Sequence, residues 1–297
     1  MTTNNSNWAD TLIHLFALAS RLEGEGQYNL AKLARAAADS LCRQADHPMD
    51  IQADKGKLAA DIQQTVEALS SLNVNADLLT ALKRGADIMA EGGLPLIDVT
   101  PHPYVCRTCG HLSLGAPDEK CPTCGAWAGT FQKFMPNYWF DALEPEAALE
   151  QLCQTPIQVE KLFVGLSDEA LNRQQKDGGW SLRNALSHLR DAQGVLAFRL
   201  DLFLKEEHPI LESKAVFAWA RNEADRPPSA REIFETYKAS REESVRKLEN
   251  LPFADWRRTG KHEEFGEITL RQQVSYFASH ELTHLSQIEL LMKQSKG

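Results

Sequence analysis

Four of the six cysteines lie in two Cys-x-x-Cys-Gly turns that are typical of a metal site. The turns are Cys106-Arg-Thr-Cys109-Gly110 and Cys121-Pro-Thr-Cys124-Gly125. In such a turn both thiolates point the same way, and the glycine frees backbone N–H groups to donate to sulfur. Two facing turns therefore form a closed tetrahedral site. We expect Fe or Zn there, because the spacing of the ligands does not separate the two metals.

A second metal-binding pattern, His280-Glu281-Leu-Thr-His284, lies near the C-terminus. Two histidines four residues apart project from one face of a helix and can share one ion. The string matches the His-Glu-x-x-His motif of zincin metalloproteases, which take their third ligand downstream. No histidine follows His284 in this sequence, so we expect the third ligand upstream. We interpret His188 as that ligand because it lies inside another amphipathic pattern. The alternative is a pair of hydrogen-bonded core histidines without a metal.

Three neutral imidazoles leave positions open for water or substrate, which is typical of a catalytic metal site. An ion held in this way can lower the pKa of a bound water to about 7, or bind a thiol as thiolate. Glu281 is the candidate catalytic proton acceptor, as in the zincins, and the alternative is a solvated helix residue. Asp191 could orient the ring of His188. We expect His208 and His262, which lie in connections beside proline or charged residues, to be solvated.

The elements that must position these residues are helical. Apolar residues recur at helical spacing over the first hundred residues and again after residue 140. Ser229 with Glu232, and Thr269 with Gln272, form patterns that begin helices. The segment with the four clustered cysteines is rich in turns and too short to own a core. We therefore expect a mainly α fold with three parts: a small helical bundle over 1–99, a turn-rich module with four cysteine ligands over 100–135 and a four-helix bundle over 140–297.

The composition of the chain indicates which classes of partner are to be expected. The chain has 297 residues, of which 43% are apolar and 25% charged, as in globular proteins. The formal net charge is −9 and basic residues form no run, so we expect no nucleic-acid partner. No apolar stretch reaches the roughly 20 residues that span a bilayer, and the N-terminus is polar. We expect a cytoplasmic protein without a membrane partner, with Cys42 and Cys153 as buried, unreactive thiols in helices.

The cysteine segment, over residues 103–134, resembles the rubredoxin-type module of rubrerythrins. The matching residues are Tyr104-Val-Cys-Arg-Thr-Cys-Gly, Ala116-Pro-Asp-Glu-Lys-Cys-Pro-Thr-Cys-Gly-Ala and a closing Phe131 or Phe134. The resemblance implies iron and one-electron transfer. The preceding helices also resemble rubrerythrin, over about 19–42. Residues 1–99 contain no Glu-x-x-His, however, and the di-iron site of such bundles needs one on each of two helices. We therefore expect a degenerate ferritin-like domain that has lost its di-iron centre.

The second half, over about 143–293, resembles the DinB-like family of metal-binding four-helix bundles. The matching residues are Gly179-Trp180-Ser181, Leu186-Ser-His188-Leu-Arg-Asp191, Phe265-Gly266-Glu267-Ile-Thr-Leu and His280-Glu-Leu-Thr-His284-Leu-Ser-Gln287. The resemblance implies that His188, His280 and His284 bind one divalent metal, with Zn, Ni and Fe all possible. DinB-like relatives include S-transferases and isomerases that use low-molecular-weight thiols, and metal-dependent hydrolases have been proposed among them. We interpret Trp180 as an anchor for helix packing.

Three functions are consistent with these patterns. The first is an enzyme, a thiol-dependent transferase or a hydrolase that acts on a small-molecule substrate at the three histidines. The second is a redox or sensing protein related to rubrerythrin, with iron at the cysteines. The third is a zinc-clamped scaffold that only binds partners. We favour the enzyme, with a low-molecular-weight thiol as a possible partner. A homodimer is a further expectation, because dimers are common among similar proteins.

Overall fold

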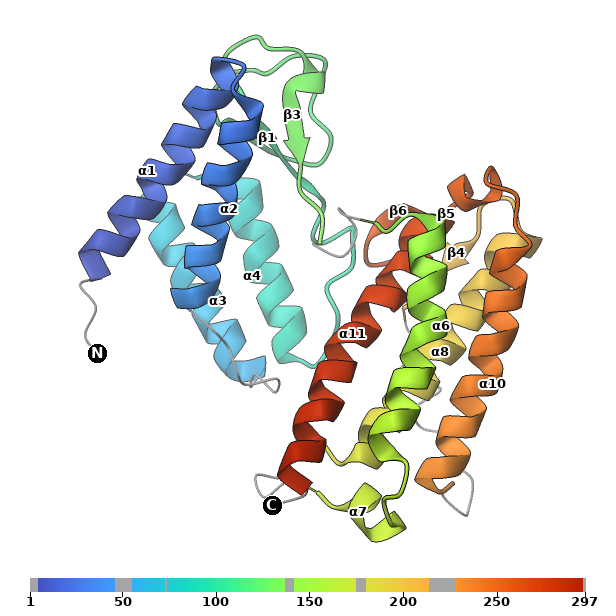
Figure 1. Cartoon of the computed structure of the whole chain (residues 1–297). Coiled ribbons are helices and arrows are strands. Elements are labelled where there is room, and N and C mark those ends of the chain that lie inside the picture. The colour runs from blue at the N-terminus through green and yellow to red at the C-terminus, as the bar shows by residue number, and fades with distance from the viewer. Residues whose placement is uncertain are drawn as a thin grey trace. The chain divides into compact units, whose positions relative to one another are not determined.

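The computed structural model of the chain consists of two compact units (Figure 1). One contains residues 1–93 and 103–133, and the other contains residues 94–102 and 134–297. Both are mainly helical, as predicted. The structure describes residues 5–45, 55–72, 74–136, 142–174, 180–213 and 228–295.

The first unit contains two helical hairpins. Helix α1 (Asn5–Gly24) pairs with α2 (Tyr28–Ala45), and α3 (Lys55–Ser71) pairs with α4 (Ala76–Ala90). These are the four helices predicted for this region. Their buried positions are mostly alanine, which lets two helices approach closely. The guanidinium of Arg35 on α2 donates twice to the carboxylate of Glu23 on α1, at 2.9 and 3.0 Å, and fixes their register.

The cysteine segment packs with these helices. Its antiparallel sheet has the order β2-β1-β3, formed by β1 (Pro103–Cys106), β2 (Leu112–Leu114) and β3 (Phe131–Lys133). A short helix, η1 (Ala128–Thr130), precedes β3. The side chain of Asn75, which caps α4, donates to the carbonyl of Leu112 at 3.1 Å. The segment therefore shares a unit with the N-terminal helices, and the three-part division into 1–99, 100–135 and 140–297 stays a prediction.

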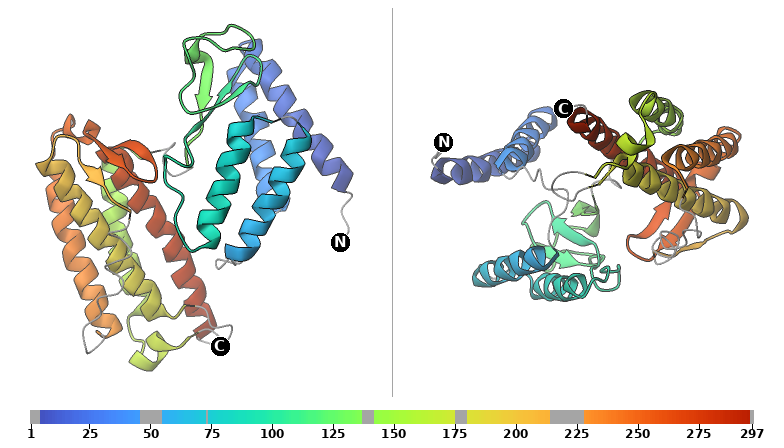
Figure 2. Two further views of the ribbon diagram at one scale, coloured as in Figure 1. Left: turned by 180° about the vertical axis from the view of Figure 1, so that it is seen from behind. Right: turned by 90° about the horizontal axis from the view of Figure 1, so that it is seen from below.

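The second unit is a four-helix bundle (Figure 2). Its helices are α6 (Pro145–Phe163), α8 (Leu182–Lys205), α10 (Ala230–Glu249) and α11 (Leu270–Ser295), and a short α7 (Asp168–Asn172) follows α6. Reciprocal hydrogen bonds between residues three apart cap three of them, as the sequence patterns predicted for α10 and α11. The pairs are Ser181 with Asn184, Ser229 with Glu232 and Thr269 with Gln272. None of the described helices is long and apolar enough to cross a membrane.

A small sheet lies at the end of the bundle where α11 begins (Figure 1). Strand β4 (Ile210–Leu211) is parallel to β5 (Thr259–His262), which pairs with β6 (Gly266–Thr269) as a hairpin. The one-turn helix η2 (Asp255–Arg257) precedes β5. Residues 94–102 run along this hairpin, because the N–H of Ile97 donates to the carbonyl of Glu263 at 3.0 Å. The sequence analysis predicted none of these strands.

A buried arginine joins all four helices of the bundle. Arg241 on α10 donates to the carboxylate of Glu281 on α11, with one contact at 2.9 Å and a second through Nη2. It also donates to Gln193 on α8 at 2.6 Å and to the carbonyl of Leu152 on α6 at 3.1 Å. Tyr237 completes the shell of the carboxylate at 3.3 Å. Burial is the largest influence and acts to lower the pKa of Arg241, but the charge of Glu281, its hydrogen bonds and the neighbouring Tyr237 together raise that pKa, so the pair is ionic.

We predict that Glu281→Leu lowers the free energy of unfolding of this unit by about 3–5 kcal/mol, because it leaves the Arg241 guanidinium buried without a counter-charge. The double variant Glu281→Leu, Arg241→Met should lose less than the single variant. Urea unfolding followed by circular dichroism measures both. Glu160→Leu is the matched control, since Glu160 pairs with Lys238 between α6 and α10 but is 39% exposed, and it should cost at most about 1 kcal/mol. A double variant no more stable than Glu281→Leu would contradict the prediction.

Candidate functional site

Helices α8 and α11 bring the three predicted histidine ligands together. One potential ligand atom from each of His188, His280 and His284 lies within 4.8 Å of the others. His280 and His284 are one turn apart on α11, and their Nε2 atoms are 3.0 Å apart. The ring of His188, from α8, lies 5.4 and 4.5 Å from those two rings, centroid to centroid. Two nitrogens bound tetrahedrally to one ion at about 2.1 Å are about 3.4 Å apart, so this close approach suits a shared ion.

The protonation of these rings also suits a cation. Nε2 of His188 and Nδ1 of His280 are buried without a hydrogen-bond partner. Burial, followed by the charge of His284, lowers the pKa of both residues to about 4, so both are neutral near pH 7. Neutral imidazoles are the form that binds a metal. The ring of His284 is oriented by Gln287, whose side-chain oxygen is 3.1 Å from Nδ1. The residues therefore fit a divalent ion.

Two aromatic side chains hold the imidazoles in place. Trp180 stacks on His284 with the ring planes 11° apart, and its centroid is 5.2 Å from that of His188. Tyr276 stacks on His280 at 5.6 Å. Trp180 also packs against the apolar core, which agrees with its predicted role as a packing anchor. Gly179, beside it in the sequence motif, lies outside the described residues.

A cavity of about 330 Å³ opens beside the histidines. Helix α8 contributes residues that all lie on one helical face, α11 contributes the neighbouring wall, and the β5–β6 hairpin closes one end. The lining residues are Leu94, His188, Asp191, Ala192, Val195, Arg199, Ser213, His262, Glu264, Phe265, Tyr276, Phe277 and His280. Because two of the three histidines line it, a small molecule in this cavity can reach an ion that they hold.

Comparison with known proteins places this arrangement in a family. Residues 151–288, which include all three histidines, match the DinB superfamily. YuaE of Bacillus subtilis is 32% identical over 140 residues, which cover 42% of this chain and 85% of YuaE. The chain belongs to the DinB superfamily. This confirms the resemblance predicted from the sequence motifs, whereas the resemblance of residues 103–134 to rubrerythrins stays a prediction.

Further relatives of the DinB domain carry names that refer to metal chemistry. A candidate metal-dependent hydrolase of Oceanobacillus iheyensis is 25% identical over 166 residues, which cover 56% of this chain and 91% of that protein. A solved structure of YfiT from Bacillus subtilis, described as a candidate metal-dependent hydrolase with an unusual four-helix bundle topology, aligns at a TM-score of 0.46. That alignment has 20% sequence identity and covers 54% of this chain and 93% of YfiT.

The structure changes the interpretation of Glu281 in the DinB motif. The alternative of a solvated residue is wrong, because Glu281 is 0% exposed. Both carboxylate oxygens accept hydrogen bonds from Arg241, on the side of α11 that faces α10. Glu281 is also not among the residues that line the cavity. Arg241 thus holds this carboxylate away from the cavity, and the role of proton acceptor stays a prediction.

The two histidines expected in solvated connections differ from each other. His208 is exposed, as predicted, and its ring contacts the hydroxyl of Thr259 at 3.2 Å. The prediction for His262 is wrong, because His262 is 1% exposed and lines the cavity of the DinB domain. Its Nδ1 accepts the backbone N–H of Glu264 at 3.1 Å, and this turn carries the ring inward. Burial, followed by the charge of Arg199, lowers the pKa of His262 to about 3.

Asp191 lines the cavity one turn after His188. Its carboxylate pairs with the neighbouring Arg190, whose Nη2 lies 2.8 Å away. The negative charge of Asp191 raises the pKa of His188, but this effect is smaller than that of burial. Orientation of the His188 ring by this carboxylate stays a prediction.

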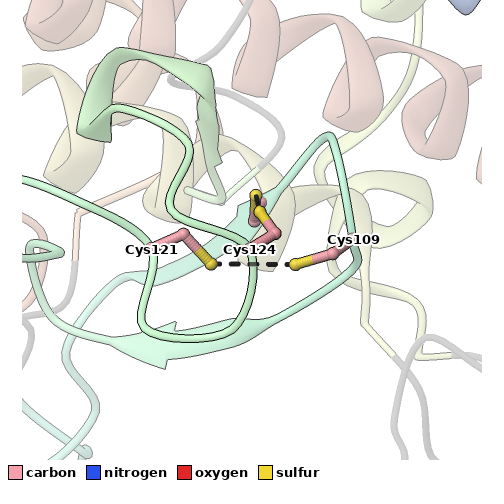
Figure 3. Close-up of side chains that lie close together, drawn as sticks. Cys109, Cys121 and Cys124 are labelled. Atoms are coloured by element: carbon pink, nitrogen blue, oxygen red, sulfur yellow. Dashed lines mark hydrogen bonds between the residues drawn. The ribbon is translucent and has the colours of Figure 1, made fainter.

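The four clustered cysteines form a second candidate metal centre, in the other unit. The sulfur of Cys109 lies 3.7 Å from that of Cys121, and the sulfur of Cys106 lies 3.8 Å from that of Cys124 (Figure 3). All four sulfurs lie within 4.8 Å of one another. Gly110 and Gly125 have φ angles of 78° and 74°, the left-handed conformation that such turns need. Phe131 closes the centre at 8% exposure, and Phe134, the alternative, is 42% exposed.

Backbone donors stabilise thiolates in this centre, as the Cys-x-x-Cys-Gly pattern predicted. Burial acts to raise the pKa of Cys106, but the N–H groups of Cys109 and Thr108, together with hydrogen bonds from the side chains of Cys124 and Cys109, outweigh it and bring the pKa to about 6. Cys121, at the same position in the second turn, also has a lowered pKa. Thiolates are the form that binds Fe or Zn. This centre is a closed set of four ligands, whereas the histidine centre opens on a cavity.

The remaining cysteines were predicted to be buried, and that prediction is wrong. Cys42 and Cys153 are both exposed. Each belongs to an apolar helical pattern, but each lies on the outer face of its helix. Partial burial and the charge of Glu249 raise the pKa of Cys153, which keeps it a thiol at neutral pH.

We predict two metal ions per chain, measured by inductively coupled plasma mass spectrometry on the purified full-length protein. Cys106→Ser with Cys124→Ser should remove one ion and His284→Ala the other, because the two ligand sets share no residue. His208→Ala, an exposed histidine, is the matched control and should keep both ions. Loss of the same ion in the cysteine and histidine variants would contradict this assignment.

We also predict that burial of His262 makes stability depend on pH. Its pKa is about 3 in the folded state and 6.5 in the reference state, so the unfolded chain takes up the proton first as the pH falls. The free energy of unfolding should therefore fall below pH 6.5, by about 1.4 kcal/mol per pH unit from this residue. Urea unfolding over a pH series measures the slope. His262→Gln should lower this slope by about 1.4 kcal/mol per pH unit, the contribution of one proton, whereas His208→Gln should leave the slope unchanged. Equal slopes in the two variants would count against a buried neutral His262.

Proposed function

We propose that this chain is a metal-dependent enzyme of the thiol-transferase type, with its reactive centre at His188, His280 and His284. The observation that carries the proposal is that these three histidines converge, each half-buried, beside a cavity of about 330 Å³ that two of them line. That volume suits a small molecule. A divalent ion bound by three imidazoles supplies Lewis acidity and leaves positions for a water molecule or a thiol.

The surroundings of the histidines favour a thiol over water as the nucleophile. Water has a pKa of about 15.7, and its activation benefits from a nearby base as well as from an ion. The carboxylate of the His-Glu-x-x-His motif does not supply that base, because Arg241 holds it. A thiol has a pKa of about 8.5 and loses its proton outright on coordination. A thiol nucleophile at this site therefore does not need an additional base from the protein.

The side chains of the DinB domain have defined roles in this proposal. His188, His280 and His284 would hold the ion, and Gln287 and Trp180 orient their rings. Phe265 and Phe277 line the cavity with apolar surface, which excludes water from the reacting group. A thiol bound there would release its proton to solvent and form a bond from its sulfur to an electrophilic carbon of the substrate, and the leaving group would depart with the bonding electron pair.

Hydrolysis is the second candidate, favoured by the names of relatives such as that of Oceanobacillus iheyensis. It needs a proton acceptor in the cavity. Glu264 lines the cavity, and burial raises its pKa, which makes its carboxylate a stronger base than an exposed glutamate. Hydrolysis at this site therefore predicts that Glu264→Gln abolishes ester or amide cleavage, whereas thiol transfer does not need that carboxylate as a base.

We expect the metal-loaded protein to conjugate a small thiol, such as cysteine, to the fluorogenic electrophile monobromobimane faster than the metal-free protein does. His188→Ala, His280→Ala and His284→Ala should each lower the rate at least about a hundredfold, because each removes a ligand. Glu289→Gln, at an exposed position of the same helix, is the matched control and should leave the rate unchanged. Loss of the metal with no change in rate would overturn the proposal, and cleavage of an ester without conjugation would favour the hydrolase.

A further inference from the structure

A buried, positively charged side chain lines the cavity away from the histidines. Arg199 of α8 is 5% exposed and lines the cavity. Its Nη2 donates to the carbonyl of Glu212 at 3.1 Å, and Nη1 approaches the side-chain oxygen of Gln273 at 3.4 Å. Both acceptors are neutral. Burial lowers the pKa of Arg199 to about 10, so the guanidinium stays charged at neutral pH. Among the described residues it forms no direct ion pair, unlike the buried Arg241, although Tyr276, Glu264 and Glu263 lie near enough to act on its pKa.

Other donors without partners surround this guanidinium. The hydroxyl of Ser213 is buried, lines the cavity and has no hydrogen-bond partner among the residues that the structure describes. The side-chain nitrogen of Gln273 is also buried without one, although its oxygen faces Arg199. A buried donor without an acceptor is costly to the folded state, and native proteins seldom leave several together. One positive charge and two unused donors are the complement of an anionic oxygen group.

Helical geometry places this group at the opposite end of the cavity from the candidate metal centre. Arg199 follows His188 by eleven residues, which is three turns, so the two share a face of α8 and lie about 16 Å apart along its axis. Gln273 precedes His284 by the same eleven residues on α11. The two helices are antiparallel, because Arg199 contacts Gln273 while His188 contacts His284. The cavity therefore has a histidine end and an arginine end.

The walls between the two ends are mostly apolar. Val195 lies between His188 and Arg199 on α8, and Phe277 lies on the facing wall of α11. Leu94 and Phe265 add apolar surface from outside the helices. We propose that the arginine end binds a carboxylate of the substrate or thiol, so that an elongated molecule spans the cavity with its reacting group at the histidines. The second half of this statement rests on the proposed function, and the carboxylate site itself does not.

A substitution of Glu264 should change the affinity for a carboxylate in the opposite direction to a substitution of Arg199. It lines the same cavity, and its negative charge opposes an incoming carboxylate. Burial raises the pKa of Glu264, and the positive charge of Arg199 acts against that rise, so the two side chains belong to one electrostatic environment. Removing this charge should strengthen carboxylate binding, whereas removing the charge of Arg199 should weaken it.

The first experiment uses the metal-free full-length protein and isothermal titration calorimetry. The probes are heptanoate and its neutral analogue heptanamide. We expect heptanoate to bind about tenfold tighter than heptanamide to the wild type. Arg199→Met should abolish that preference without weakening heptanamide, and Glu264→Gln should increase it. Equal affinities in the wild type, or a preference that survives Arg199→Met, would overturn the proposal.

Folding of the variants is checked by circular dichroism. Should Arg199→Met fail to fold, Arg199→Lys and Ser213→Ala carry the test, because each keeps a positive charge at the site. We expect Ser213→Ala to weaken heptanoate alone and Arg199→Lys to retain part of the preference, since an ammonium lacks the fork of donors that fits a carboxylate. Unchanged heptanoate affinity in both variants would again overturn the proposal.

A second experiment separates this proposal from the proposed function. Cobalt-loaded protein is titrated with a straight-chain mercaptocarboxylate and with the matching mercaptoalcohol. The thiolate-to-cobalt absorption band that appears in the difference spectrum, taken against the protein before titration because the cysteine centre absorbs too, reports binding at the histidines. We expect the band at lower concentrations of the mercaptocarboxylate, and Arg199→Met should remove this difference. Absence of any band would count against thiol chemistry at the histidines. A band with equal affinities for the two thiols would count against the carboxylate site.

Discussion

The bundle depends on one buried charge pair. Arg241 donates to groups on α6, α8 and α11, so a single side chain fixes the position of all four helices. It also fixes the rotation of α11. Successive residues of a helix point about 100° apart, so a helix that directs Glu281 toward α10 must direct His280 toward another neighbour, here α8. The glutamate of the His-Glu-x-x-His motif thus helps to place the imidazoles, and its chemistry is that of a counter-ion.

The rotation of α11 determines what the rest of the cavity contains. Once His280 and His284 face α8, the residues at helical spacing from them, Tyr276 and Gln273, face the same helix. On α8 the corresponding face carries His188 and Arg199. Burial keeps the imidazoles of His188 and His280 neutral and leaves Arg199 charged, because desolvation lowers the pKa of all three groups from very different starting values. The packing of α8 against α11 therefore places the candidate metal-binding nitrogens at one end of the cavity and the positive charge of Arg199 at the other.

Much of this organisation could be predicted from the spacing of residues that lie close together in the sequence. The spacing of apolar residues predicted the helices, Ser229 and Thr269 marked the beginnings of two of them, and the interval between His280 and His284 indicated a shared face. Burial was harder to predict. His262 looked solvated because it follows a lysine in a polar connection, but three strands too short to show alternation carry it inward. Glu281 looked exposed because its partner, Arg241, is forty residues away. The place of Arg199 on the cavity face could have been predicted from the sequence, because Arg199 follows His188 by three helical turns and so lies on the same face of α8.

The two candidate metal centres differ in a way that bears on reactivity. Four cysteines surround one point, and backbone N–H groups occupy the outer lone pairs of the sulfurs, so a bound ion there has no position left for a substrate. Three histidines provide fewer ligands than a divalent ion needs, and the missing side faces a cavity. Of the two centres, the histidine centre is therefore the one that leaves room for a small molecule beside a bound ion. At the cysteine centre the same physical argument leaves two roles, support of a segment too small to own a core and exchange of electrons by an iron, neither of which requires an open position.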